Sequence, residues 1–196
     1  MRRRACELWP EVLKAASRYG MRVGSPAANH CRPGGGGLQD SNCFQAPMDW
    51  FDEFFAQPGC GLDTVDFIAT HKYGCNATDT IQYVMELHNR YHKPIWLTEF
   101  SCSKAPVRTR PPARPNTRAT RLTISRRACS HGTRAQVPKH LAFMKEILPA
   151  FDAMPEVIPR YAWFVARAGT AANGPNDALI TGDSLNELGR YYNSTA

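Results

Sequence analysis

The chain of 196 residues lacks any apolar run long enough to cross a membrane, and no apolar signal-peptide stretch follows its basic first residues. Its seven cysteines never show the Cys-x-x-Cys spacing that zinc sites use. Asp and Glu are missing altogether from one long stretch, residues 103–137. These absences argue against a membrane protein and a zinc site. We expect no metal, no cofactor and no membrane partner.

The net charge of +7 comes from that same stretch, which contains nine of the chain's 24 lysines and arginines. The other 15 bases face 17 acids, so the remainder is mildly acidic. The stretch lacks the aromatic residues that are interleaved with basic ones in nucleic-acid modules, and we expect no nucleic-acid partner. Because it also lacks apolar periodicity, burial cannot offset the entropy of ordering it. We predict a basic disordered insert over residues 103–137.

Cysteines this numerous, without metal-ligand spacing, favour disulfide bonds and therefore an oxidising compartment. Two sequons, Asn76-Ala77-Thr78 and Asn193-Ser194-Thr195, are typical of proteins that pass through the secretory pathway. We predict an extracellular or cell-wall protein with glycosylation candidates at Asn76 and Asn193.

Helical and strand patterns alternate along the chain. Strands are predicted over residues 21–26, 65–73, 95–100 and 160–165. Helices are predicted from Pro10 to Gly20, from Pro47, over residues 79–92, from Pro138, and from Ser184, where Ser184 and Glu187 match a capping box. The last two strands are apolar on both faces, which is typical of a parallel sheet covered by helices, and the fold class is therefore α/β.

The predicted strands end in polar or aromatic side chains that could bind a ligand, namely His71, Tyr73, Glu99, Tyr161 and Trp163. Period-two alternation groups Glu99 with Ile95 and Leu97, His71 with Tyr73, and Tyr161 with Trp163. If these faces line one interior, we expect Glu99, His71, Tyr73 and Trp163 to converge at the carboxyl ends of the strands.

Glu99 is the candidate for chemistry, because a retaining glycosidase needs a carboxylate nucleophile. It also needs a second carboxylic acid about 5 Å away, and aromatic rings that bind the apolar faces of sugars. Glu99 could be the nucleophile, with His71, Tyr73, Tyr161 and Trp163 binding the substrate. The alternative is that Glu99 only pairs with a neighbouring arginine or histidine at a strand end.

Five segments resemble, in the same order, the Asl1-like glycosyl hydrolase catalytic domain, a β-1,3-glucanase type close to glycoside hydrolase family 128. They are residues 65–73, 93–100 (Lys-Pro-Ile-Trp-Leu-Thr-Glu-Phe), 143–149, 160–164 (Arg-Tyr-Ala-Trp-Phe) and 185–191. The resemblance implies the C-terminal half of a (β/α)8 TIM barrel with Glu99 as nucleophile at the end of strand seven. Residues 1–102 would run from helix 4 to strand 7, and residues 138–196 would supply helix 7, strand 8 and helix 8.

The chain departs from this family in its acid/base residue, a glutamate that follows asparagine at the end of strand four. No Asn-Glu pair stands at such a place here, since Asn186-Glu187 belongs to the predicted last helix. We therefore expect an N-terminally truncated hydrolase that acts on β-1,3-glucan by a retaining double displacement only in its complete form. The alternative is a non-catalytic glucan-binding remnant.

Two further expectations follow from this arrangement. A half barrel has open edges at strands five and eight, so self-association is expected. Cys75 and Cys102 each lie just past the end of a strand, and these strands would be neighbours. We predict a Cys75–Cys102 disulfide, although free thiols or a weak metal site with His71 remain alternatives.

Overall fold

The computed structural model of the chain describes residues 2–31, 33, 43, 45–102, 137–167 and 177–195. The predicted basic insert, with Cys129, lies outside the described residues except for Val137, which begins a helix. Within the described part, no helix has the length and apolar character that a membrane span requires.

Four parallel strands form the centre of the fold, in the order β1-β2-β3-β4. They are β1 (Ala28–Asn29), β2 (Ile68–Tyr73), β3 (Ile95–Ser101) and β4 (Arg160–Trp163). The predicted α/β class with four parallel strands is therefore confirmed. β1 and β4 are the two edge strands of this sheet.

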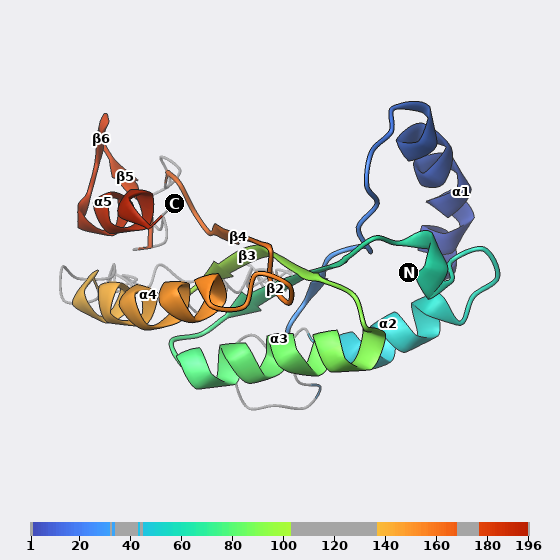
Figure 1. Cartoon of the computed structure of the whole chain (residues 1–196), viewed down its shortest axis with the longest axis horizontal. Coiled ribbons are helices and arrows are strands. Elements are labelled where there is room, and N and C mark those ends of the chain that lie inside the picture. Colours follow the sequence, from blue (N-terminus) through green and yellow to red (C-terminus); the bar gives the residue numbers. More distant parts are fainter. Residues whose placement is uncertain are drawn as a thin grey trace, which may run out of the picture.

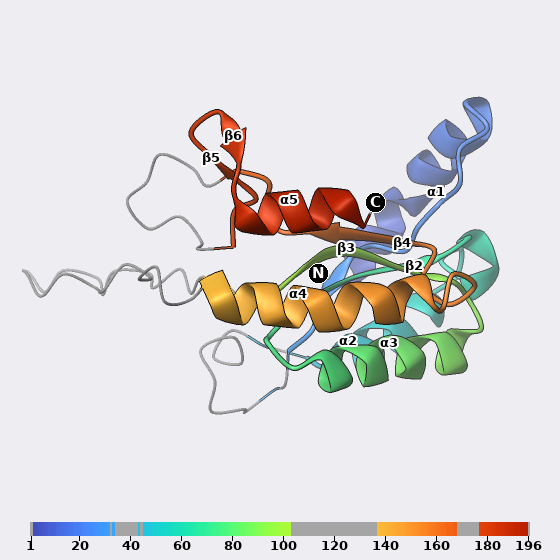
Figure 2. The same ribbon diagram turned by 60° about the vertical axis from the view of Figure 1, so that its left-hand side comes forward.

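In both ribbon views the second, third and fourth helices lie below the strands, whereas the first and the last helix lie higher (Figures 1 and 2). The helices are α1 (Arg2–Arg18), α2 (Pro47–Phe55), α3 (Ala77–Tyr91), α4 (Val137–Asp152) and α5 (Glu187–Ser194), with a 3-10 turn at Leu62–Thr64. A small antiparallel hairpin of β5 (Ile180–Thr181) and β6 (Ser184–Leu185) precedes α5. Helices α3 and α4 lie side by side below the strands (Figure 2).

The core lies between the sheet and these helices. Ile68, Leu97 and Phe100 are fully buried on the strands, and Leu87 and Leu148 are fully buried on the helices that cover them. Burying large apolar side chains of this kind stabilises a fold by about 1.5–3 kcal/mol each. The opposite face of the sheet, referred to below as the concave face, carries the side chains of His71, Tyr73 and Glu99.

Helix α3 begins at an asparagine that the sequence also marks as a glycosylation candidate. The Asn76 side chain accepts a hydrogen bond from the Asp79 backbone N–H at 3.0 Å, which satisfies one of the free donors of the first turn. At the other end, His92 adopts a left-handed conformation and Pro94 prevents the helix from continuing.

Removing this cap is expected to weaken the fold. Asn76→Ala should lower the free energy of unfolding by about 1 kcal/mol, because the Asp79 N–H loses its acceptor. Thr78→Ala, which also removes the sequon but leaves the cap, should cost clearly less. Urea unfolding of both unglycosylated variants measures the difference. Equal losses would mean that the cap does not contribute.

The first helix begins earlier than predicted. It starts at Arg2 rather than Pro10, and Pro10 lies inside it. A proline in a helix removes one backbone hydrogen bond. Two long-range contacts hold the first turns despite that loss: the Cys6–Cys60 disulfide, and Trp9, whose ring packs edge-on against Phe54 at 5.2 Å.

Two other predicted elements also needed correction. In the region predicted as a strand over residues 21–26, only Gly24 makes an isolated bridge, to Phe67, and the paired strand is Ala28–Asn29. The Ser25 hydroxyl, not its backbone, accepts from the Ala69 N–H. The last helix begins at Glu187, and Ser184 lies in β6 instead of capping it.

Asn186 replaces Ser184 as the cap of the last helix. Its side chain accepts from the Gly189 N–H at 3.0 Å and donates to the Ala178 carbonyl at 2.6 Å. The second bond ties the helix to the hairpin, and a Cβ on Gly189 would lie 2.1 Å from the Leu179 carbonyl oxygen. This close approach requires glycine.

Candidate active site

Three polar side chains meet at the carboxyl ends of β2 and β3. Glu99 lies opposite His71 in the strand register. The Tyr73 hydroxyl donates a short hydrogen bond to Glu99 Oε2, and His71 Nδ1 lies 3.5 Å from the same oxygen. The Glu99 side chain is 34% exposed. The site is thus an oriented carboxylate that solvent can reach.

An irregularity in the β2–β3 register turns Glu99 toward these partners. Leu97 pairs with Thr70 and Glu99 pairs with His71, so Thr98 is the extra residue of a bulge. Leu97 is fully buried under the helices, whereas Glu99 contacts side chains of the concave face. The prediction that Glu99 shares a face with Ile95 and Leu97 was therefore wrong, because the bulge breaks the alternation.

Burial decides the protonation of the two partners of Glu99. It lowers the pKa of His71 below its usual value, and the charge of Glu99 opposes this only in part. The pKa of Tyr73 is raised, first by burial and then by the hydrogen bond and charge of Glu99. At neutral pH, Tyr73 donates and His71 is uncharged. Glu99 is therefore not simply one half of an ion pair.

The lowered pKa of His71 makes a prediction about stability. The unfolded chain binds this proton more readily than the folded protein, so the stabilisation is complete above about pH 6.5 and is lost as the pH falls. We expect the Tm to fall less between pH 7.5 and pH 5.5 in His71→Gln than in the wild type. His92→Asn, at an exposed histidine, is the control. Parallel curves for wild type and His71→Gln would contradict the prediction.

Tyr161 and Trp163 do not join this site, contrary to the predicted convergence. Trp163 packs edge-on against Phe100 at 5.2 Å, and its indole N–H donates to the Asp177 carbonyl at 2.7 Å. The Tyr161 hydroxyl donates to Asp152 on α4 at 2.6 Å. Both rings therefore lie on the helix side of the sheet, opposite Glu99, where apolar packing against Phe100 holds them.

The aromatic ring that reaches the site from this segment is Phe164. Its ring lies edge-on to Tyr73, with 5.9 Å between the centroids, and it is only partly buried. Neighbouring residues of a strand point to opposite faces, so assigning Trp163 to the core face would have predicted that Phe164 points to the site. That assignment depends on contacts with Phe100, which the sequence pattern does not show.

A second carboxylate, Asp177, acts on the same tyrosine. Its charge is among the causes that raise the pKa of Tyr73. Asp177 is fully buried, and within the described residues neither of its carboxylate oxygens has a hydrogen-bond partner. In this position it contributes to the electrostatics of Tyr73 but is not open to a substrate from solvent.

A disulfide closes the rim of the site, as predicted. Cys75 and Cys102 are bonded, with 4.2 Å between their Cα atoms, and the Gly74 N–H donates to the Ser101 carbonyl beside them. Two more disulfides, Cys6–Cys60 and Cys31–Cys43, lie elsewhere. Cys75 is therefore not available to a metal with His71. No cluster of three or more potential metal-binding side chains occurs among the described residues.

The two sequon asparagines lie at the surface. Asn76 and Asn193 are both exposed, at the start of α3 and near the end of α5. Their glycosylation stays a prediction.

The described residues thus form a parallel sheet packed against helices, with a glutamate at the carboxyl end of a central strand. Residues 2–192 match a family model described as the glycosyl hydrolase catalytic core. The chain belongs to this family. Alkali-sensitive linkage protein 1 of Schizosaccharomyces pombe is 30% identical over 146 residues, which are 74% of this chain and 22% of that protein.

Solved structures of glycoside hydrolase family 128 share the fold. An endo-β-1,3-glucanase from Amycolatopsis mediterranei, solved with laminaritriose, has a TM-score of 0.60 and 23% identity, covering 100% of this chain and 66% of that one. An oligosaccharide-binding protein from Cryptococcus neoformans has a TM-score of 0.60 and 19% identity, covering 97% and 59%. The chain thus spans less than two thirds of each of these structures and under a quarter of the yeast protein.

Proposed function

We propose that this chain carries the nucleophile of a β-1,3-glucan hydrolase site, with Glu99 in that role, and forms half of a (β/α)8 barrel. The observation that carries the proposal is the partly exposed Glu99 carboxylate, held by a protonated Tyr73 beside an uncharged His71. The family 128 structural neighbours include an endo-β-1,3-glucanase and an exo-β-1,3-glucanase, which supports the choice of glucan.

In the complete site, catalysis proceeds by double displacement. Glu99 attacks the anomeric carbon, the glycosidic C–O bond breaks, and an acid gives its proton to the leaving oxygen. Water then hydrolyses the glycosyl ester and frees the carboxylate. The hydrogen bond from Tyr73 fixes the orientation of Glu99, and His71, whose pKa is lowered by burial, does not tie Glu99 up in an ion pair at neutral pH.

Aromatic rings on the concave side would hold the sugars. Tyr73 and Phe164 stand edge-on to each other beside Glu99, and we propose them as the platform together with His71. This revises the role predicted for Tyr161 and Trp163, whose rings are occupied by Phe100 and α4.

Among the described residues, no solvent-accessible carboxylate is known to lie beside Glu99 as a second acid. Asp177, whose charge acts on Tyr73, is fully buried. We therefore propose that the chain binds β-1,3-glucan and turns it over little or not at all. The alternative function is that of a glucan-binding protein without hydrolysis. The oligosaccharide-binding proteins among the structural neighbours favour this alternative.

An extracellular or cell-wall location belongs to this proposal. Three disulfides join described cysteines, and such bonds persist in oxidising compartments. We also propose that the chain self-associates through its open sheet edges, which template pairing with other strands.

Binding and hydrolysis of laminarihexaose test the proposal. Calorimetry should detect binding that Phe164→Ala weakens about tenfold, because a ring contact of this kind is worth about 1 kcal/mol or more. Tyr161→Phe, which removes a hydroxyl on the other face, should bind like the wild type. Absence of binding would contradict the proposed function. Laminarin hydrolysis that Glu99→Gln abolishes would contradict the low turnover and leave the nucleophile in place.

A further inference from the structure

The two polar atoms of the Asn76 side chain have different surroundings. The Oδ1 atom accepts from the Asp79 N–H at 3.0 Å, and this bond fixes the orientation of the amide, because the amide nitrogen cannot accept it. Within the described residues, Asn76 Nδ2 donates no hydrogen bond, and the residue is exposed. The nitrogen that N-linked glycosylation modifies is therefore free, while the oxygen caps α3.

A glycan on Asn76 is compatible with this cap. The linkage replaces one hydrogen on Nδ2 and leaves Oδ1 as an acceptor for the Asp79 N–H. Asn76 follows β2, which is a central strand, so the glycan is attached away from the edge strands β1 and β4. The open edges stay available for the proposed self-association.

Folding closes this sequon on both sides. The Asn76 carbonyl accepts from the Thr80 N–H at 3.1 Å and from the Thr80 hydroxyl at 3.0 Å, and Ala77 is buried. On the other side, Cys75 is bonded to Cys102. An enzyme that modifies Asn76 must also read the residue two positions on, so it needs the whole sequon exposed. The folded and oxidised rim does not offer that.

Synthesis of the chain leaves time for modification before this closure. Cys75 and Cys102 are 27 residues apart, and at ordinary synthesis rates these residues take roughly 1–5 s to add. Until then neither the disulfide nor the pairing of β2 with β3 can form. Disulfide formation itself takes seconds or longer. The sequon is therefore accessible first and enclosed afterwards.

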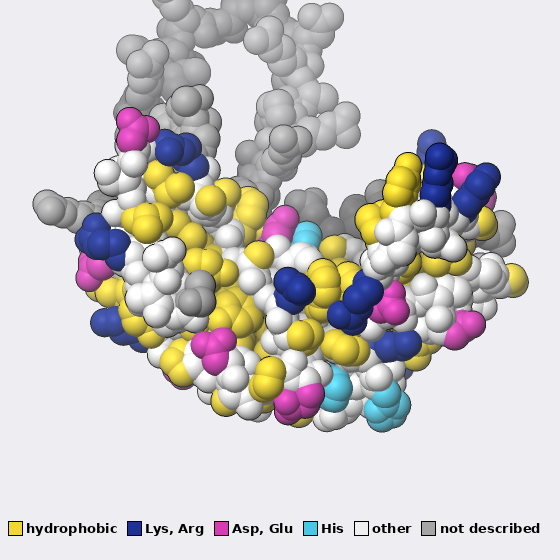
Figure 3. Space-filling view, turned by 45° about the horizontal axis from the view of Figure 1, so that its top comes forward, with side chains coloured by type: hydrophobic (Ala, Val, Ile, Leu, Met, Phe, Trp, Pro, Cys, Tyr) yellow, Lys and Arg dark blue, Asp and Glu magenta, His cyan; other side chains and the backbone are white. Residues whose placement is uncertain are grey.

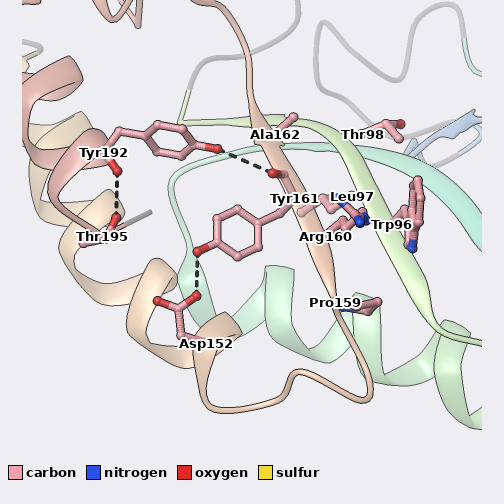
Figure 4. Close-up of a pocket in the computed structure, with 10 residues that line it drawn as sticks. All are labelled: Trp96, Leu97, Thr98, Asp152, Pro159, Arg160, Tyr161, Ala162, Tyr192 and Thr195. Atoms are coloured by element: carbon pink, nitrogen blue, oxygen red, sulfur yellow. Dashed lines mark hydrogen bonds between the residues drawn. The ribbon is translucent and has the colours of Figure 1, made fainter.

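The second sequon, at Asn193, is held differently. The Thr195 hydroxyl donates to the Tyr192 carbonyl at 2.9 Å, a bond drawn in Figure 4, and the Ser194 hydroxyl donates to the Tyr191 carbonyl at 2.7 Å. These are local bonds in the last turn of α5, where helices fray. Among the described residues no disulfide adjoins this sequon. Asn193 is thus a matched control, whose access depends less on folding.

The surface also favours a hydrophilic attachment. Figure 3 shows hydrophobic side chains at the surface among charged ones, and Leu8, Tyr19 and Met21 are each more than half exposed. An N-linked glycan is bulky and solubilising, so it would offset part of this apolar surface.

We propose that Asn76 carries an N-linked glycan that is attached before the Cys75–Cys102 disulfide forms. Asn76 Nδ2 bonds to the anomeric carbon of a lipid-diphosphate oligosaccharide, the bond from that carbon to the diphosphate oxygen breaks, and the nitrogen loses a proton. The two thiols then close by exchange with an oxidised dithiol, which is reduced. This modification rests on the proposed extracellular location and not on the role of Glu99.

Peptide mapping of the full chain, secreted from eukaryotic cells behind a cleavable signal, tests the site. Removal of the glycan by an amidase in heavy-oxygen water converts a glycosylated asparagine to a labelled aspartate. We expect the label at Asn76, in a non-reduced fragment that also contains Cys102. Thr78→Ala should lose the label and Thr78→Ser should keep it. An unlabelled Asn76 in the secreted wild type would overturn the site, whereas absent laminarihexaose binding would contradict only the proposed function.

The order of events is tested with the unglycosylated full chain, either folded and oxidised or reduced and unfolded, given oligosaccharyltransferase and lipid-linked oligosaccharide. Asn76 should be modified at least about tenfold faster in the reduced chain, because the folded sequon is reached only through local opening. The difference at Asn193 should be smaller. Equal rates at Asn76, or no modification of the reduced chain, would overturn the proposal. A difference as large at Asn193 would remove the part assigned to the disulfide.

Discussion

Phe100→Ala should lower the free energy of unfolding by about 3–5 kcal/mol, the range for removing a large aromatic from a packed core. Phe100 is fully buried and its ring contacts Phe151 of α4 at 5.5 Å, as well as Tyr161 and Trp163 of β4. The substitution thus opens a cavity where β3, β4 and α4 join. Since small domains are stable by about 5–15 kcal/mol, the loss is large.

Urea unfolding followed by far-ultraviolet circular dichroism measures this loss. Tyr19→Ala is the control, because Tyr19 is 68% exposed and its removal should change stability by about 0.5 kcal/mol or less. Phe100→Leu should fall between the two. A cost below about 1 kcal/mol for Phe100→Ala would mean that the sheet and α4 are not packed as described.

Glu99→Gln, one residue away, should leave the fold intact and remove the chemistry. Glu99 is partly exposed and faces away from the core, so an isosteric amide changes little packing. A dinitrophenyl laminaribioside has a leaving group that needs no proton, so the first step does not require an acid. We expect release of dinitrophenol by the wild type and a fall of at least about 10³-fold in Glu99→Gln.

Glu156→Gln is the matched control, since Glu156 is an exposed carboxylate in the turn between α4 and β4. It should react like the wild type. If both variants released dinitrophenol at the wild-type rate, the reaction would come from elsewhere on the protein.

Much of the fold was predictable because local rules agreed with tertiary packing. The apolar spacing and Pro47 defined α2, Pro94 set the end of α3, and the strand at residues 95–100 matches β3 within one residue. The prediction of Cys75–Cys102 followed from adjacent strand ends, and the structure contains that bond. These features depend on neighbours in sequence or on strand order alone.

The details that were wrong depend on long-range contacts. Nothing in the strand pattern marks Thr98 as a bulge. That bulge turns the Glu99 side chain to the other face of the sheet from the Leu97 side chain. Ring contacts with Phe100 and Phe151 determine which face of β4 packs on the core. Trp163 contacts Phe100 and Tyr161 contacts Phe151, so the Phe164 ring points to the site instead. A strand pattern with aromatic residues in succession is compatible with both faces.

The start of the last helix likewise depends on contacts that the sequence pattern does not show. Ser184 and Asn186 are both good capping residues, and pairing between β5 and β6 decides in favour of Asn186. His71 and Tyr73 do lie beside Glu99 at the carboxyl ends of β2 and β3, while the catalytic and binding roles of these residues stay predictions.

The most direct measurement of the central claim is the mass of the protein after reaction with an activated 2-deoxy-2-fluoro laminaribioside, which slows release of a covalent intermediate. The account predicts one added glycosyl unit, mapped by peptide analysis to Glu99 and absent from Glu99→Gln. An adduct on another residue, or continued aryl release without any adduct, would contradict it.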